Sequence, residues 1–124
     1  MTLALWCVLI AALLPYVWGT LSKGGQAYDN ARPRLQQKSG WRQRADWAQQ
    51  NAWEAFAPFA AAVLIAHWAH ARQPTVDLLA GLFGVFRVGH GLSYLADRAT
   101  LRSLAWSAGF CCVLGLFAAA ALAG

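Results

Sequence analysis

Residues 44–71 read RADWAQQNAWEAFAPFAAAVLIAHWAHA, a polar segment that runs directly into a long apolar one. In the apolar half, residues 55–71, the only titratable side chains are His67 and His70, so this half predicts a helix that crosses a membrane. The polar half carries an arginine, two carboxylates and an asparagine. Glu54 is therefore either the last solvated residue before the membrane or a residue inside it.

The composition of the whole chain predicts an integral membrane protein. Of its 124 residues, 59% are hydrophobic and 12% are charged, whereas about 25% of the residues in an ordinary globular domain are charged. Seven tryptophans point the same way, because aromatic residues concentrate at membrane interfaces. Too little polar material is present to cover a soluble fold.

Four apolar segments are long enough to cross a bilayer. The expected spans are residues 3–21, 47–71, 76–96 and 101–123. For the first of them a cleaved signal peptide is the alternative, but MTLALWC lacks the usual basic start. Short connections between the later spans favour antiparallel neighbours. The predicted fold class is all-α, an integral membrane four-helix antiparallel bundle that forms a single domain over residues 1–124.

A polar loop is expected over residues 22–46, where Gly, Asn, Pro and Lys predict turns. Six of the ten Lys and Arg residues fall between Lys23 and Arg44. The positive-inside rule then places the loops at 22–46 and 97–102 in the cytoplasm and both termini outside. An alanine-rich, lysine-poor chain of this kind fits a bacterial inner membrane. A nucleic-acid-binding arm is the alternative for the basic stretch, but its position between apolar spans argues against it.

No metal site is recognisable. Cys7, Cys111 and Cys112 lie in apolar runs without CxxC or Cys/His spacing, so we expect packing residues. His67 and His70 are three residues apart near the end of the second span, without an obvious third ligand. We expect these two histidines to be interface residues.

Arg87 is the charge that a bilayer tolerates least. Nine residues without a formal charge flank it on each side, which places it near the bilayer midplane. A central arginine is costly, so it should face the bundle interior and have a partner. His90 and Tyr94 follow at i+3 and i+7 on the same helical face. Snorkelling is the alternative, but the nearest interface is more than two turns away.

A second polar stripe is formed by Arg44, Trp47, Asn51 and Glu54, which share one face if the helix starts early. Pro58 cannot donate to the carbonyl of Glu54, so that oxygen needs another donor. We therefore expect this polar face to look inward. We also expect Glu54 to pair with Arg87, within the bundle or across a subunit interface, either as a structural pair or as part of a site.

The stretch RADWAQQNAWE fits an RAxxAxxNxxE pattern, which resembles the MAPEG family (membrane-associated proteins in eicosanoid and glutathione metabolism), especially its bacterial branch. YDNARPR and YLADRATLRSLAW are similar to the same branch, and the likeness covers nearly the whole chain. The resemblance implies a four-helix subunit that assembles as a homotrimer. It also implies that glutathione binds as a cosubstrate between adjacent subunits, near the cytoplasmic face.

The same resemblance suggests a set of site residues. Arg102 is the candidate catalytic residue, since a guanidinium beside a thiol lowers the pKa of that thiol and exposes the nucleophile. The candidate glutathione-binding residues are Arg44, Asn51, Glu54, Arg87, His90, Tyr94 and Arg98. Trp47, Ala55 and His90 depart from the residues expected in glutathione-using members, and each change removes a hydrogen-bond donor.

Two functions from different classes follow. The first is a glutathione-dependent transferase or peroxidase that acts on lipophilic electrophiles reaching the site through the membrane lipids. The alternative is a non-catalytic trimeric membrane scaffold or lipid-binding protein that retains the family's polar core. A small-molecule transporter is a third function, disfavoured because four short helices leave little room for alternating access.

Overall fold

A computed structural model describes residues 1–24, 31–32 and 38–124 of the chain. Most of the YDNARPR motif lies outside these residues. The described part contains four helices and no strand, so the predicted all-α four-helix class is confirmed. The helices are α1 (Leu3–Lys23), α2 (Gly40–Trp68), α3 (Gln73–Leu95) and α4 (Ala99–Ala123).

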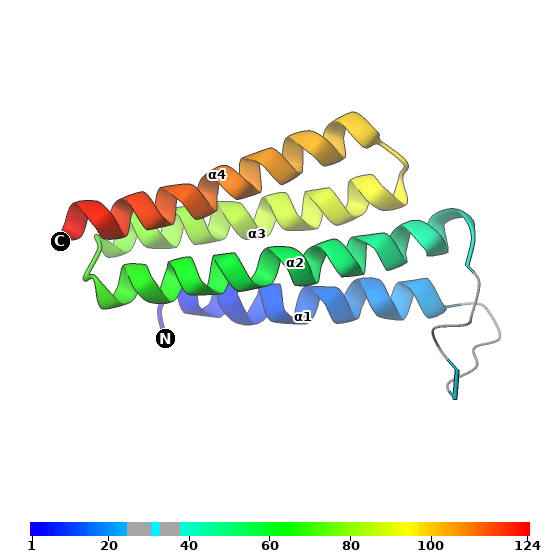
Figure 1. Ribbon diagram of the computed structural model, residues 1–124, viewed down its shortest axis with the longest axis horizontal. Coiled ribbons are helices and arrows are strands. Elements are labelled where there is room, and N and C mark those ends of the chain that lie inside the picture. The colour runs from blue at the N-terminus through cyan, green and yellow to red at the C-terminus, as the bar shows by residue number, and fades with distance from the viewer. Residues whose placement is uncertain (25–30, 33–37) are drawn as a thin grey trace.

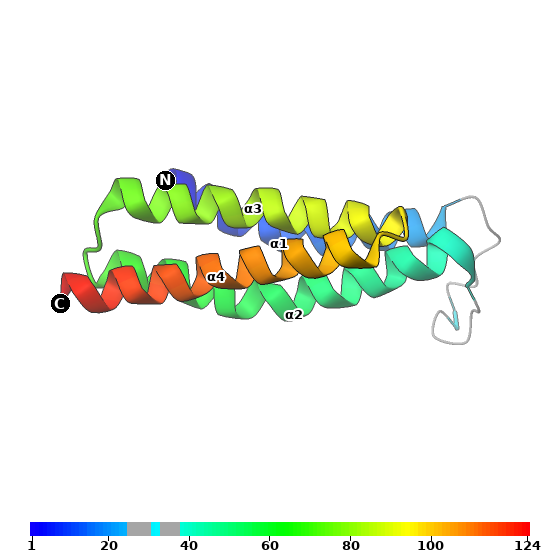
Figure 2. The same ribbon diagram turned by 90° about the horizontal axis from the view of Figure 1, so that it is seen from above.

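The helices run up and down along one long axis (Figures 1 and 2). Both termini lie at the same end as the α2–α3 connection, and the α3–α4 connection lies at the opposite end. α2 and α3 pack against each other in the middle, α1 packs on both of them, and α4 packs on α3 and α2. α4 therefore covers the side of the α2–α3 pair that α1 leaves open.

α2 begins at Gly40, well before the span expected at residue 47. Ala45, Ala48 and Ala52 are buried at helical spacing, so small side chains pack this polar half of the helix closely against its neighbours. Charged residues on the other faces made the segment resemble a loop in the sequence. α1, α3 and α4 have the length and hydropathy of membrane spans. α2 is not among these candidates, because its first half is polar.

The core between α2 and α3 is built on two aromatic rings. Phe59 and Phe83 are buried and stack with ring centroids 3.8 Å apart. Toward the α3–α4 end, Trp18 of α1 packs directly on Gly91 of α3, where an added Cβ would lie 2.1 Å from the indole ring. Large apolar side chains such as Trp68 cover the outer surface, which suits a chain surrounded by lipid.

At the end of the bundle that carries the α2–α3 connection, polar contacts hold the start of α1. Thr2 Oγ1 accepts a hydrogen bond from Leu5 N at 3.3 Å and lies 3.0 Å from His67 Nε2. Asp77 accepts a hydrogen bond from Ala4 N at 2.9 Å. His67 thus ties α2 to the N-cap of α1, whereas His70 is exposed in the turn after α2 with φ 56°.

The three cysteines are all free and occupy two kinds of position. Cys7 and Cys112 are buried in the core, as expected of packing residues. Cys111 is exposed on the outer surface of α4. Among the described residues, no group of three or more His, Cys, Asp or Glu side chains could hold a metal ion.

Candidate functional site

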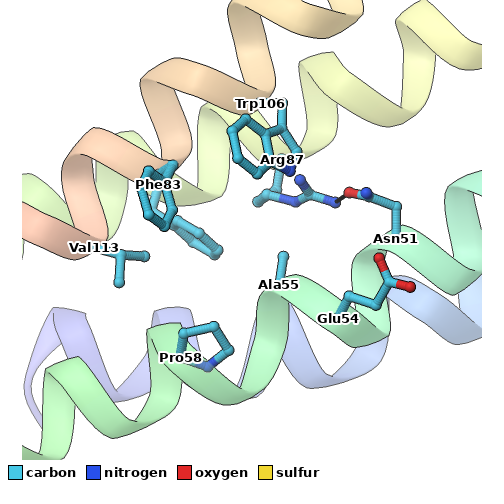
Figure 3. A pocket seen from close by; sticks show the side chains of 9 residues that line it. Asn51, Glu54, Ala55, Pro58, Phe83, Arg87, Trp106 and Val113 are labelled. Carbon is cyan, nitrogen blue, oxygen red and sulfur yellow. Dashed lines mark hydrogen bonds between the residues drawn. The ribbon is translucent and has the colours of Figure 1, made fainter.

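A cavity of about 170 Å³ opens between α2 and α4, with α3 as its floor (Figure 3). Its walls are mostly apolar and aromatic, and its polar groups gather at one end. The lining residues are Asn51, Glu54, Ala55, Pro58, Phe83, Arg87, Trp106, Phe110 and Val113. We call this space the apolar cavity.

Arg87 forms the polar end of the apolar cavity together with Asn51. The Arg87 side chain is 4% exposed, and its Nη2 donates to Asn51 Oδ1 at 2.7 Å. The expectation that Arg87 turns into the bundle and finds a partner is thus confirmed. A neutral amide oxygen satisfies one donor of a guanidinium that carries five, and it does not cancel the buried charge.

The predicted ion pair between Glu54 and Arg87 does not form within the subunit. Arg87 bonds instead to Asn51, which lies one turn earlier on α2, and the described residues contain no ion pair to Arg87. The Glu54 side chain is exposed at the edge of the apolar cavity, beside Asn51 (Figure 3). The prediction is wrong for a pair within the subunit, because helical spacing fixes the shared face but not which of two neighbouring residues reaches the partner; a pair across a subunit interface stays a prediction.

A second cavity, of about 200 Å³, adjoins the first toward the α3–α4 connection. It is lined by Asn51, His90, Tyr94, Arg102, Ser103, Trp106 and Ser107. We call it the polar cavity. Asn51 and Trp106 line both spaces, so the two cavities meet at these side chains.

The ring of Tyr94 contacts two other residues that line the polar cavity. The Arg102 guanidinium carbon lies 4.4 Å from the centroid of the Tyr94 ring, and the His90 ring meets the same tyrosine edge-on at 5.2 Å. His90 is 3% exposed, and its Nδ1 has no hydrogen-bond partner among the described residues. A buried polar atom without a partner is rare in folded proteins, and here it belongs to a residue that lines a cavity.

The electrostatics of the polar cavity favour an anion. Arg102 lies in the first turn of α4, where the helix dipole already contributes positive charge. A second cation, Arg87, lies one turn before His90 on α3. The cation–π contact with Tyr94 holds Arg102 in place without neutralising it.

Two of the predicted site residues do not line either cavity. Arg44 donates from Nη2 to the carbonyl of Leu95 at 3.2 Å and so stabilises the C-terminal end of α3. Arg98 is exposed at the N-cap of α4. The structure thus brings together Asn51, Glu54, Arg87, His90, Tyr94 and Arg102 and leaves Arg44 and Arg98 outside.

Of the α4 residues that line the two cavities, sequence reasoning found only Arg102. Trp106, Phe110 and Val113 line the apolar cavity, and Ser103 and Ser107 line the polar one. Most of α4 is apolar on all sides, so the face that turns inward shows little contrast with the others. The spacing of Arg102, Trp106 and Phe110 at i, i+4 and i+8 was the available signal.

Ala55 shows what one departure from the expected family pattern does. Its small side chain lines the apolar cavity, where a tyrosine would occupy the space. Trp47, the second departure, packs against Tyr94 with ring centroids 6.5 Å apart. Trp47 thus contacts a residue of the polar cavity without lining that cavity, whereas Ala55 leaves room in the apolar cavity.

These features define an integral membrane protein, an antiparallel four-helix bundle with adjoining polar and apolar cavities between α2, α3 and α4. The chain belongs to the MAPEG family, because the model of that family matches residues 3–122. A search among curated proteins finds no match to the chain.

Proposed function

We propose that this protein is a glutathione-dependent transferase or peroxidase that acts on lipophilic electrophiles. The observation that carries the proposal is that Arg102 and His90, whose buried Nδ1 has no partner among the described residues, line the same polar cavity. Glutathione carries two carboxylates and two amide groups, so it offers both acceptors and negative charge. The donors lining the polar cavity suit such a ligand.

Each residue of the polar cavity has a role in this proposal. Arg102 stabilises the thiolate of glutathione, because a nearby cation favours the ionised thiol. Asn51 and Tyr94 orient the peptide by hydrogen bonding. His90 receives or donates the hydrogen bond that the protein itself leaves unmade. Arg44 and Arg98 line neither cavity and have no role in this scheme.

We also propose that the protein works as a homotrimer in which α2 faces a neighbouring subunit. α2 and α3 are antiparallel and Phe59 stacks on Phe83, so Glu54 is level with Arg87 and Val88 of α3, inside an apolar span. An exposed acidic side chain at this depth is costly against lipid tails. A second copy that covers α2 would shield Glu54 and enlarge the site.

The positive loops support a cytoplasmic location for the end that carries the α3–α4 connection, with both termini outside. In a bacterial inner membrane, glutathione would then enter the polar cavity from the cytoplasm. The lipophilic partner would arrive through the bilayer.

The alternative, a non-catalytic trimeric scaffold or lipid-binding protein, has one observation in its favour. The contact between Arg87 and Asn51 gives the buried guanidinium a partner within the chain without any ligand, as a structural polar core requires. In that case Arg102 and His90 would serve assembly alone.

Calorimetry with glutathione and the purified protein in detergent separates the two functions. The enzyme proposal predicts saturable binding that weakens in Arg102→Ala and is retained in Arg98→Ala, a matched arginine outside the cavities. Absence of binding at millimolar glutathione, with the oligomer intact by light scattering, would contradict the enzyme proposal and favour the scaffold.

A further inference from the structure

The apolar cavity has a different chemical character from the polar cavity, although the two spaces meet. Phe83, Phe110 and Val113 give it an apolar wall, and Trp106 forms the partition toward the polar cavity. Within the described residues, it opens between α2 and α4 at the level of apolar spans. Its occupant therefore has a compact apolar body.

The charges around the apolar cavity determine which polar group a bound ligand can carry. Arg87 contributes one positive charge, and its described hydrogen bond to Asn51 uses one of five donors. Glu54 contributes one negative charge at the edge of the same space. A carboxylate ligand would gain from Arg87 but be repelled by Glu54. A neutral ligand with an acceptor oxygen gains the hydrogen bond without that repulsion.

We propose that the apolar cavity binds a neutral lipophilic carbonyl compound whose oxygen accepts a hydrogen bond from Arg87. This inference deepens the proposed function and rests on it, because it names the class of electrophile as an α,β-unsaturated carbonyl compound. The apolar body packs against Phe83 and Phe110. The carbonyl lies near Asn51, where the two cavities meet.

The chemistry of this class matches the position of a guanidinium. The thiolate of glutathione forms a carbon–sulfur bond to the β-carbon, and the π electrons of the carbon–carbon double bond move toward the carbonyl oxygen. The resulting enolate oxygen is stabilised by the Arg87 donors. Water then protonates the α-carbon, so the product is a thioether ketone and no oxidant or reductant is consumed.

Binding is tested without glutathione, using three probes of nearly the same shape. They are 4-phenylbutan-2-one (neutral carbonyl), 3-phenylpropanoate (carboxylate) and isopentylbenzene (no acceptor). The readout is the indole N–H resonance of Trp106 in isotope-labelled protein in lipid nanodiscs, assigned with Trp106→Phe. The proposal predicts a saturable shift with the ketone, and affinity about tenfold or more weaker for the other two probes.

Variants separate the contributions of charge and space. Arg87→Met removes the donor and should bring the ketone down to the affinity of the hydrocarbon. Glu54→Gln removes the repulsion and should raise the affinity for 3-phenylpropanoate about tenfold. Ala55→Leu fills the cavity without touching Arg87 and should abolish the shift, whereas Ala118→Leu, an exposed position on α4, should leave it unchanged.

The outcomes distinguish this inference from the proposed function. Equal shifts with all three probes, or no effect of Ala55→Leu on the ketone titration, would overturn the inference even if glutathione binds. Tighter binding of 3-phenylpropanoate than of the ketone in the wild type would also overturn it. Selective ketone binding in a protein that fails to bind glutathione would retain the cavity assignment and overturn the transferase.

Discussion

The bond between Arg87 and Asn51 gives the most direct prediction about stability. Asn51→Ala leaves the Arg87 guanidinium, which is 4% exposed, without its described hydrogen bond. Hydrogen bonds to charged groups contribute about 1.5–3 kcal/mol in proteins, whereas interhelical side-chain bonds inside a membrane average about 0.6 kcal/mol. Because the donor is charged and the apolar cavity gives it some access to water, we expect a loss of about 1.5 kcal/mol.

A double-mutant cycle in bicelles measures how much the hydrogen bond between Asn51 and Arg87 contributes to the free energy of unfolding. Asn51→Ala, Arg87→Met and the double variant are unfolded reversibly with a denaturing detergent, and the free energies of unfolding are compared. The double variant should regain most of the stability that Asn51→Ala loses, because no buried cation remains. A cost below about 0.3 kcal/mol for Asn51→Ala, or additive single effects, would refute the assignment of Asn51 as the partner of Arg87.

Two further predictions concern packing. Gly91→Ala should destabilise the bundle by about 1–3 kcal/mol, because the added Cβ would lie 2.1 Å from the Trp18 ring; Gly89→Ala, where nothing lies within 4 Å, should have no such cost. Phe59→Ala should lose at least about 2 kcal/mol through the cavity that it opens, although lipid reduces the hydrophobic contribution. Phe117→Ala on the exposed surface is its control, and equal unfolding free energies within either pair would contradict the packing described here.

The fold could be predicted from the sequence because the apolar segments are long and the connections between them are short. The inward orientation of Arg87 could also be predicted, since a charge near the middle of a span has few stable positions other than the bundle interior. The start of α2 was not predicted. Charged and polar side chains hid the buried alanines at positions 45, 48 and 52, which pack this half of the helix.

The candidate site could be predicted only in outline. Stripes on α2 and α3 identified Asn51, Arg87 and Tyr94 because polar residues stand out in an apolar span. Asn51 and Glu54 lie on the same face of α2, about one turn apart, so their spacing does not determine which of them reaches Arg87. The inward face of α4 was marked only by the spacing of Arg102, Trp106 and Phe110, because an apolar helix surrounded by lipid shows little contrast between its two sides.

Absorbance of the glutathione thiolate, followed by stopped flow after mixing with the protein, tests the central claim most directly. The polar cavity is proposed to ionise the thiol through Arg102, held at 4.4 Å from the Tyr94 ring. Thiolate absorbance should rise on mixing with the wild type and with Arg98→Ala, and should be absent with Arg102→Ala. Binding of glutathione without any thiolate signal in the wild type, or an equal signal in Arg102→Ala, would contradict the account.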